Sequence, residues 1–190
     1  RDVETVERRY VLTDGSEHVL SMTRCVLRDA GGAFDGFLVQ ARDITEKERA
    51  LEALRLKEEE VRLLIESTSE GIFGMDGRGR ITFANAAAAR MLGYRHAGEL
   101  VGLAAHATMH HTHADGSVYP ADDCLMGKAM AQGQSMTCDS EVYWRRDGTC
   151  FPVAYSSAPL IRDGVLVGIV VGFQDITVRR QYQAELQQAK

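Results

Sequence analysis

The sequence predicts an α+β protein in which an antiparallel sheet carries helices on one face. Two observations indicate this. Strand-type runs separated by Asp-Gly turns stand at both ends of residues 67–177, with three helix-type runs between them. A short pattern also occurs twice, ending each time in Asp-Ile-Thr ahead of a charged helix, at 43–45 and 175–177. Such a repeat, offset by about 132 to 134 residues, indicates an array of like modules.

Composition excludes several classes of protein. The chain has 190 residues, of which 45% are hydrophobic and 26% charged, as in ordinary globular domains. The net charge is −5 and no basic stripe is visible, so we expect no nucleic-acid partner. No apolar run approaches the ~18 residues that span a bilayer, so we expect no membrane contact within this segment. The four cysteines are scattered, which predicts free thiols in a reducing, cytoplasmic compartment.

The ends of the chain predict that it is a segment of a longer protein. It begins at Arg1 without a methionine and ends at Lys190 inside a helical pattern. The parent protein could therefore carry a membrane anchor elsewhere.

Residues 1–45 predict three strands, at 5–12, 18–27 and 37–42. The turns between them carry Asp14-Gly15 and Gly31-Gly32, which are hairpin signals. A meander of this length buries too little surface to stand alone. We therefore expect its sheet to be covered by the same segment of a second chain or by the helix that follows.

Residues 46–66 predict a long helix. Thr45 is a suitable N-cap, and Glu48 completes a capping box. Apolar residues recur at the a and d positions of a heptad pattern, at Leu51, Leu54, Val61 and Ile65. Glu58 interrupts the series. Two interpretations stay open, a solvated linker helix or a short parallel coiled coil, and we predict a homodimer formed through this face.

Residues 67–177 predict one complete domain. Strands are expected at 71–76 and 81–84, followed by a helix from 86 to 93 between the N-cap Asn85 and the C-cap Gly93. A helical turn at 97–100, an aperiodic stretch at 103–121 and a helix at 122–132 come next. Three long strands, 136–145, 149–160 and 165–174, complete the sheet, and Thr177 opens a final helix.

This order, together with particular motifs, resembles the PAS sensory domain family. The motifs are GIFGMD at 71–76, GRITFANAA at 79–87, MLGY at 91–94, WRRDGT at 144–149, FPV at 151–153 and DIT at 175–177. The resemblance implies a PAS fold, with a five-stranded antiparallel sheet in the order 2-1-5-4-3 and helices on one face enclosing a ligand pocket. Residues 1–45 resemble the last three strands of a preceding PAS domain.

The resemblance also implies a division of the chain and a role. We expect a half domain at 1–45, a linker or coiled-coil helix at 46–66, a PAS domain at 67–177 and the start of a signalling helix at 178–190. The implied parent is a bacterial sensor, a histidine kinase of a two-component system or a cyclic-dinucleotide enzyme. Adjacent PAS and output domains of that parent are the expected partners. The segment contains no kinase or cyclase signature, so we predict no catalysis of its own.

The densest group of reactive side chains is a histidine cluster. Four of the six histidines fall within eight residues, at His106, His110, His111 and His113. The first two share a face if the stretch is helical, and the last two share one if it is extended. PAS domains place irregular turns beside their pocket here, and haem-binding members use a histidine from this region. Haem is therefore the first cofactor candidate, although an ordinary loop held by histidine hydrogen bonds explains the cluster equally well.

Other residues give further alternatives for the pocket. Phe73 and Met75 are predicted in its wall or core, and Trp144 could stack on a flavin, the second cofactor candidate. No metal is expected; if one binds, the ligands would be His111, His113 and Cys124. The leading function is a dimeric module that binds a small ligand and relays the change. The alternatives are a ligand-free dimerisation spacer and, remotely, a zinc-dependent hydrolase.

The repeated Asp-Ile-Thr motif predicts the mechanical link of the module. Asp43 with Thr45, and Asp175 with Thr177, stand where a strand passes into a helix. A carboxylate there accepts backbone N–H groups and complements the helix N-terminus, so these residues are not catalytic candidates. We expect a shift of the last strand to be passed to the helix that continues from it.

Overall fold

The computed structural model describes residues 3–188 and divides the chain into two compact units. The first ends at Arg62 and the second begins at Leu63. Among the described residues, no helix has the length and apolarity that a membrane crossing requires.

The first unit is a three-stranded antiparallel meander followed by a helix. Its strands β1 (Val3–Val11), β2 (Glu17–Arg28) and β3 (Phe34–Asp43) pair in the order β1-β2-β3. Helix α1 (Thr45–Ser67) follows directly. Each element lies where the sequence predicts it and extends one to three residues further at one or both ends, because ladder and helix hydrogen bonds continue into the flanking residues.

The meander leaves large apolar side chains exposed in a single chain. Phe34 packs edge-on against Phe37 at 4.9 Å, and the guanidinium of Arg24 lies 5.1 Å from the Phe37 ring. Leu38 and Val39 beside them are also exposed. Such a surface normally meets a partner, so the covering of this sheet stays a prediction.

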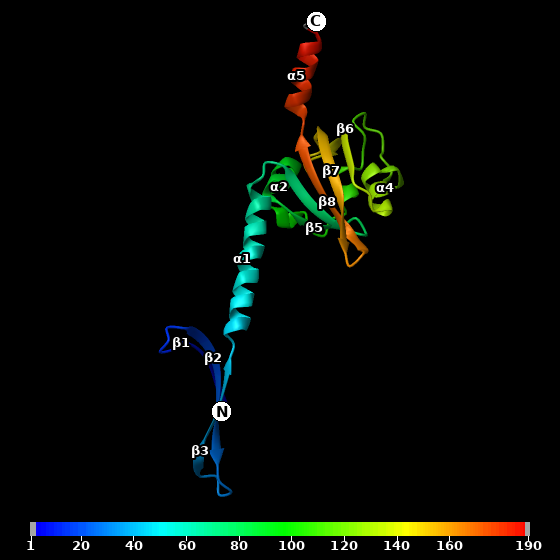
Figure 1. Cartoon of the computed structure of the whole chain (residues 1–190). Coiled ribbons are helices and arrows are strands. Elements are labelled where there is room, and N and C mark those ends of the chain that lie inside the picture. The colour runs from blue at the N-terminus through cyan, green and yellow to red at the C-terminus, as the bar shows by residue number, and fades with distance from the viewer. Residues whose placement is uncertain (1–2, 189–190) are drawn as a thin grey trace. The chain divides into compact units, whose positions relative to one another are not determined.

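The second unit contains a five-stranded antiparallel sheet with helices against one face (Figure 1). The order is β5-β4-β8-β7-β6, which is the predicted 2-1-5-4-3. The strands are β4 (Gly71–Asp76), β5 (Ile81–Ala84), β6 (Met136–Trp144), β7 (Cys150–Arg162) and β8 (Val165–Asp175). The helices are α2 (Ala86–Leu92), η1 (Ala97–Glu99), α3 (Ala105–Met109), η2 (Ala121–Asp123), α4 (Leu125–Gln132) and α5 (Thr177–Gln188).

The structure differs from the prediction in the middle of the domain. Helix α3 occupies a stretch with no visible period, because five residues are too few to display one. The helix expected at 122–132 is broken at Cys124, whose ψ of 117° is extended. This break separates η2 from α4 and accompanies the burial of the Cys124 side chain.

The core lies between the sheet and the helices. Its fully buried aromatic rings come from four strands, and Tyr143 of β6 packs against Phe173 of β8 at 5.3 Å between ring centroids. Phe73 of β4 meets the same Phe173 ring at 5.9 Å. Aromatic rings in these edge-on arrangements connect the three strands β4, β8 and β6.

Candidate functional site

A cavity of about 400 Å³ opens between strand β4 and the segments that follow α2. Phe73 and Met75 form its wall on the sheet side. The opposite side is mostly small or sulfur-containing, formed by residues such as Ala105, Met109, Met126, Gly127 and Met130. Three reactive side chains also line it, His106, His110 and Cys124. Its size and apolar character are typical of small-molecule pockets.

His110 is the most connected polar side chain at the cavity. It caps the C-terminal end of α3 and is buried. Its Nε2 lies 2.8 Å from Oε2 of Glu141, and its Nδ1 lies 3.4 Å from Sγ of Cys124. The N–H of Nε2 does not point straight at the carboxylate, so the first contact is an ion pair more than a linear hydrogen bond. Burial lowers the pKa of His110, but the contacts with Cys124 and Glu141 outweigh it and raise the pKa to about 9.

Glu141 of strand β6 is held by three donors. The hydroxyl of Tyr119 donates to Oε1 at 2.8 Å and that of Tyr155 to Oε2 at 2.6 Å, beside the ion pair with His110. Burial raises the pKa of this carboxyl, and the bonds from His110 and Tyr155 reverse the effect and lower the pKa to about 2. Glu141 is therefore a fixed negative charge behind His110.

His106 presents a free nitrogen. Its Nε2 lies 2.9 Å from the carbonyl oxygen of Tyr119, while its buried Nδ1 has no partner among the described residues. His106 and His110 stand one helical turn apart and share a face, as the helical alternative predicts. Atoms of His106, His110 and Cys124 that could ligate a metal all lie within 4.8 Å of one another. Burial raises the pKa of the Cys124 thiol, but the contact with His110 and the backbone hydrogen bonds from Gly127 and Met126 together outweigh burial, and the pKa is lowered.

The other predicted pocket residues lie elsewhere. The His111 ring stacks on Trp144 at 5.6 Å, and Trp144 Nε1 donates to the carbonyl of Thr112 at 2.7 Å. His113 stacks on Tyr119 at 4.3 Å. The loop closes on itself through the bridge between Thr112 and Val118, and neither His111 nor His113 is among the residues that line the cavity with Cys124. The structure thus groups Cys124 with His106 and His110 in place of His111 and His113.

Several residues of the site carry no sequence signal. Glu141, Tyr119 and Tyr155 come from a strand, a loop and another strand, and only the folded sheet brings their oxygens together. Arg145 lies within the motif WRRDGT at 144–149, but the motif does not indicate which groups its guanidinium contacts. The sequence signal that could have indicated this network is Glu141 itself, because a charged side chain in a half-buried strand needs a partner.

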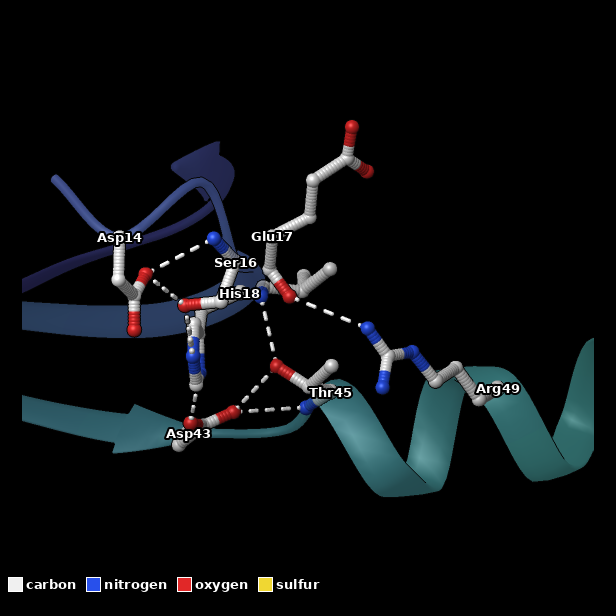
Figure 2. Close-up of polar contacts among 8 residues, drawn as sticks. Asp14, Ser16, Glu17, His18, Asp43, Thr45 and Arg49 are labelled. Atoms are coloured by element: carbon white, nitrogen blue, oxygen red, sulfur yellow. Dashed lines mark hydrogen bonds and ion pairs between the residues drawn. The ribbon is translucent and has the colours of Figure 1, made fainter. Parts of the chain in front are cut away.

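The first strand-to-helix junction has the geometry that the repeated motif predicts. Figure 2 shows Asp43 Oδ1 accepting from the Thr45 amide at 2.9 Å and from its hydroxyl at 2.5 Å. The Thr45 oxygen in turn accepts from the amide of Val19 at 2.8 Å. His18 Nδ1 lies 2.7 Å from the other Asp43 oxygen. The bonds from Thr45, then that from His18, lower the pKa of Asp43 to about 2.

The second junction repeats this arrangement at the start of α5. Asp175 Oδ1 accepts from the Thr177 amide at 2.9 Å and from its hydroxyl at 2.5 Å. Here the second carboxylate oxygen pairs with Arg145 at 2.8 Å. Arg145 also donates to the carbonyl of Met91 at 3.0 Å and lies over the Phe151 ring at 4.3 Å. One guanidinium thus joins α2, β7 and the end of β8.

Residues 59–176 match the family model described as the PAS fold. The chain belongs to the PAS family. Its PAS domain coincides with the second unit, so the cavity lies between the sheet and the helices of a PAS domain.

One curated protein that is similar to this chain is a bacterial enzyme with a much longer sequence. The chain is 28% identical over 187 residues to a probable diguanylate cyclase, DgcE, of Escherichia coli strain K12. That alignment covers 95% of this chain and 16% of the cyclase, so the chain spans about a sixth of the length of this relative.

Solved structures show the same fold. The PAS domain of an HTR-like protein from Haloarcula marismortui aligns with a TM-score of 0.52 at 19% identity, over 68% of this chain and 99% of that domain. A PAS domain from Colwellia psychrerythraea gives 0.51 at 19% identity, over 65% and 98%. An RNA-binding light-oxygen-voltage receptor gives 0.56 at 12% identity, over 98% and 81%.

The two cofactor candidates can be tested against this PAS pocket. Haem iron is held by an imidazole nitrogen, and the Nε2 atoms of His106 and His110 face Tyr119 and Glu141. Only the Nδ1 atoms remain to bind iron, and the ring carbon next to each Nδ1 carries the Cβ, which would collide with a flat macrocycle. These histidines, as placed, therefore do not fit haem. Trp144 does not line the cavity, so it is not placed to stack on a flavin there.

Proposed function

We propose that this PAS domain is a ligand-sensing and relay module of a larger bacterial signalling protein, with no catalysis of its own. The observation that carries the proposal is the cavity, whose β4 wall pairs directly with β8. Phe73 is opposite Val171, and Met75 is opposite Ile169. Strand β8 ends at Asp175, where α5 begins.

These contacts define a route by which ligand binding in the cavity would reach helix α5. Occupation of the cavity displaces the Phe73 side chain, which touches the ring of Phe173 on β8. Two residues further along, the Asp175 carboxylate fixes the first turn of α5. A ligand alters output only if it binds two states of this strand with different affinity. The polar link at Asp175 is therefore where we expect the signal to leave the domain.

Replacing Asp175 with alanine should uncouple the helix from the sheet. The variant loses both bonds to Thr177 and the ion pair with Arg145. We expect amide exchange in residues 177–188 to rise about fivefold, since the loss of a cap costs about 1 kcal/mol. In the parent protein, the response of output to stimulus should disappear.

Asp147→Ala is the matched control for this variant. Asp147 accepts from the Thr149 amide at 2.9 Å and from its hydroxyl at 2.7 Å, the same motif in the β6–β7 hairpin, where no helix follows. We expect the Asp147→Ala protein to have the same amide exchange in α5 and the same response to stimulus as the unchanged protein. An Asp175→Ala protein that still responds normally would refute the relay.

Occupation of the cavity separates this function from that of a ligand-free spacer. Native mass spectrometry and an absorption spectrum of freshly purified protein should reveal a bound small molecule or ion. Ala105→Phe, which fills the cavity, should abolish its retention. An empty cavity in every preparation, with no ligand taken up from cell extracts, would favour the spacer.

We further propose that the parent acts as a dimer joined through α1. Leu51, Leu54 and Val61 are exposed and Ile65 is half-buried, so the predicted a and d face is available to a second chain. Leu54→Glu should shift the chain from dimer to monomer in light scattering, because it buries a charge in the seam. Leu56→Glu, at the opposite f position and similarly exposed (54% against 58%), should leave the dimer intact. A monomeric unchanged chain would contradict the proposal.

We also propose that the first unit is the last part of a preceding PAS domain. Its three strands and the Asp43–Thr45 junction parallel β6–β8 and Asp175–Thr177, including the following helix. The parent would then carry PAS domains in tandem, with an output domain beyond α5. The likeness to a probable diguanylate cyclase supports a cyclic-dinucleotide enzyme as one such parent.

A further inference from the structure

The ring nitrogens of two cavity histidines are held in defined protonation states. His106 Nε2 faces the carbonyl oxygen of Tyr119 at 2.9 Å, and a carbonyl only accepts. Nε2 therefore carries the hydrogen, which leaves a lone pair on Nδ1. That Nδ1 atom is buried and has no partner among the described residues. A buried lone pair without a donor is costly to keep unless something binds it.

His110 has the same orientation with a stronger partner. Its Nε2 lies 2.8 Å from the Glu141 carboxylate, which again only accepts, so Nδ1 is the atom turned toward Cys124 Sγ at 3.4 Å. The two tyrosine hydroxyls on Glu141 fix that carboxylate. A carboxylate behind an imidazole is the arrangement that orients metal-ligating histidines and strengthens them as ligands.

We propose that His106 Nδ1, His110 Nδ1 and Cys124 Sγ form a site for a transition-metal ion of the zinc type, with one position open to the cavity. Two imidazoles and a thiolate select such ions over magnesium or calcium, which prefer oxygen ligands. This deepens the proposed function, because it names the class of ligand for the same cavity. Upon binding, the ion replaces the proton between His110 and Cys124, which passes to solvent.

The spacing of the three atoms suits this site after a small closure. In a tetrahedral zinc site, with bonds of about 2.0–2.3 Å, ligand atoms lie about 3.3–3.8 Å apart. The His110–Cys124 edge, at 3.4 Å, already has this spacing, and one possible ligand atom from each of the three residues lies within 4.8 Å of the other two. The remaining edges need to close by about 1.5 Å or less. The fourth position, toward the cavity, is available to water or to a donor atom of an organic ligand.

Binding would also act on the sheet. His110 connects the ion to Glu141 on β6, and Glu141 is bonded to Tyr155 on β7. The His110 ring lies 5.3 Å from that of Tyr143, which in turn packs against Phe173 of β8. An ion that draws His110 toward Cys124 thus shifts contacts that lead to the start of α5.

Cobalt titration of the whole 190-residue chain, freed of metal with a chelator, tests the site. We expect one Co²⁺ per chain, an intense visible spectrum of a four-coordinate ion and a thiolate-to-cobalt charge-transfer band. Added Zn²⁺ should remove both. Cys124→Ser should abolish the charge-transfer band, and His106→Ala should weaken binding at least about tenfold.

Matched controls lie in the same domain. His113→Ala removes a histidine of the same cluster and Cys138→Ser another thiol, and both should leave the cobalt spectrum unchanged. Trp144 fluorescence during urea unfolding checks that each variant is folded. A cobalt spectrum that persists in both Cys124→Ser and His106→Ala, or no binding by the folded unchanged chain, would overturn the metal site.

The outcomes for metal and for sensing remain distinct. If cobalt does not bind but a co-purified organic molecule is lost in Ala105→Phe, the sensing function stands and the metal site fails. If cobalt binds as expected but amide exchange in α5 does not change upon binding, the metal site stands and the relay fails.

Discussion

Replacing Asn85 with alanine should lower the free energy of unfolding of the PAS domain by about 3–5 kcal/mol. The side chain is fully buried and makes four hydrogen bonds. Its Oδ1 accepts from the amides of Ile72 and Ala88, both at 2.9 Å. Its Nδ2 donates to the carbonyls of Ile65 and Glu70, at 3.0 and 2.9 Å. Alanine leaves buried backbone groups without partners, which is among the costliest of point changes.

Asn85→Ser isolates the capping part of this effect. A serine can still accept from the Ala88 amide, as an N-cap does, but is too short to serve the other three groups. We expect it to recover about 1 kcal/mol of the loss and no more. The measurement is urea unfolding followed by fluorescence of Trp144, the single tryptophan, which lies in β6 and reports this domain alone. If Asn85→Ala lowers the free energy of unfolding only by as much as the loss of a helix cap does, the other three hydrogen bonds of Asn85 do not contribute to stability.

The Asn85 network also explains how an incoming helix is joined to the sensor. Ile65 belongs to the last turns of α1, Ile72 to β4 and Ala88 to α2. We therefore expect a motion of the end of α1 to reach the β4 wall of the cavity through the Asn85 side chain. The junctions at Asp175 and Asn85 thus stand at the exit and the entrance of the same domain.

Most of the fold could be predicted, because its signals are local. Asp-Gly turns, the capping box at Thr45 and the glycine at position 93 mark element ends within a few residues of sequence. Asn85 was predicted as an N-cap for the same reason, and its Ala88 bond confirms it. Its bonds to Ile65 and Glu70 could not be predicted, since they depend on how distant segments meet.

The candidate site was predicted less completely, for the same physical reason. The sequence shows four histidines close together but not which of them face the same way. In the structure, the short helix α3 and the loop after it direct them to different surroundings. His106 and His110 enter the cavity, whereas His111 and His113 stack on other rings. The partners that give His110 its chemistry come from other elements: Glu141 and Tyr155 from strands further along the chain, and Tyr119 from the loop after α3.

Replacing Gly168 with alanine should destabilise the same domain by about 2–4 kcal/mol. Gly168 of β8 pairs with Asp76 of β4, and a Cβ there would lie 2.1 Å from the carbonyl oxygen of Met75. The obstacle is backbone at the centre of a sheet, so the strands must separate. Gly77→Ala is the control, since a Cβ at Gly77 meets nothing within 4 Å. Equal unfolding midpoints for the two variants in urea would contradict this prediction.

The internal repeat places a glycine, Gly36, in the first unit at the position that corresponds to Gly168. Gly36 lies in β3, and there a Cβ would meet nothing within 4 Å. In the PAS domain the crowding comes from β4, the strand that has no counterpart beside β3 among the described residues. The open space at Gly36 is what we expect if β3 pairs, in the parent protein, with a strand supplied by another segment. The same glycine would then be needed in both units because, in each, a neighbouring backbone must approach closely.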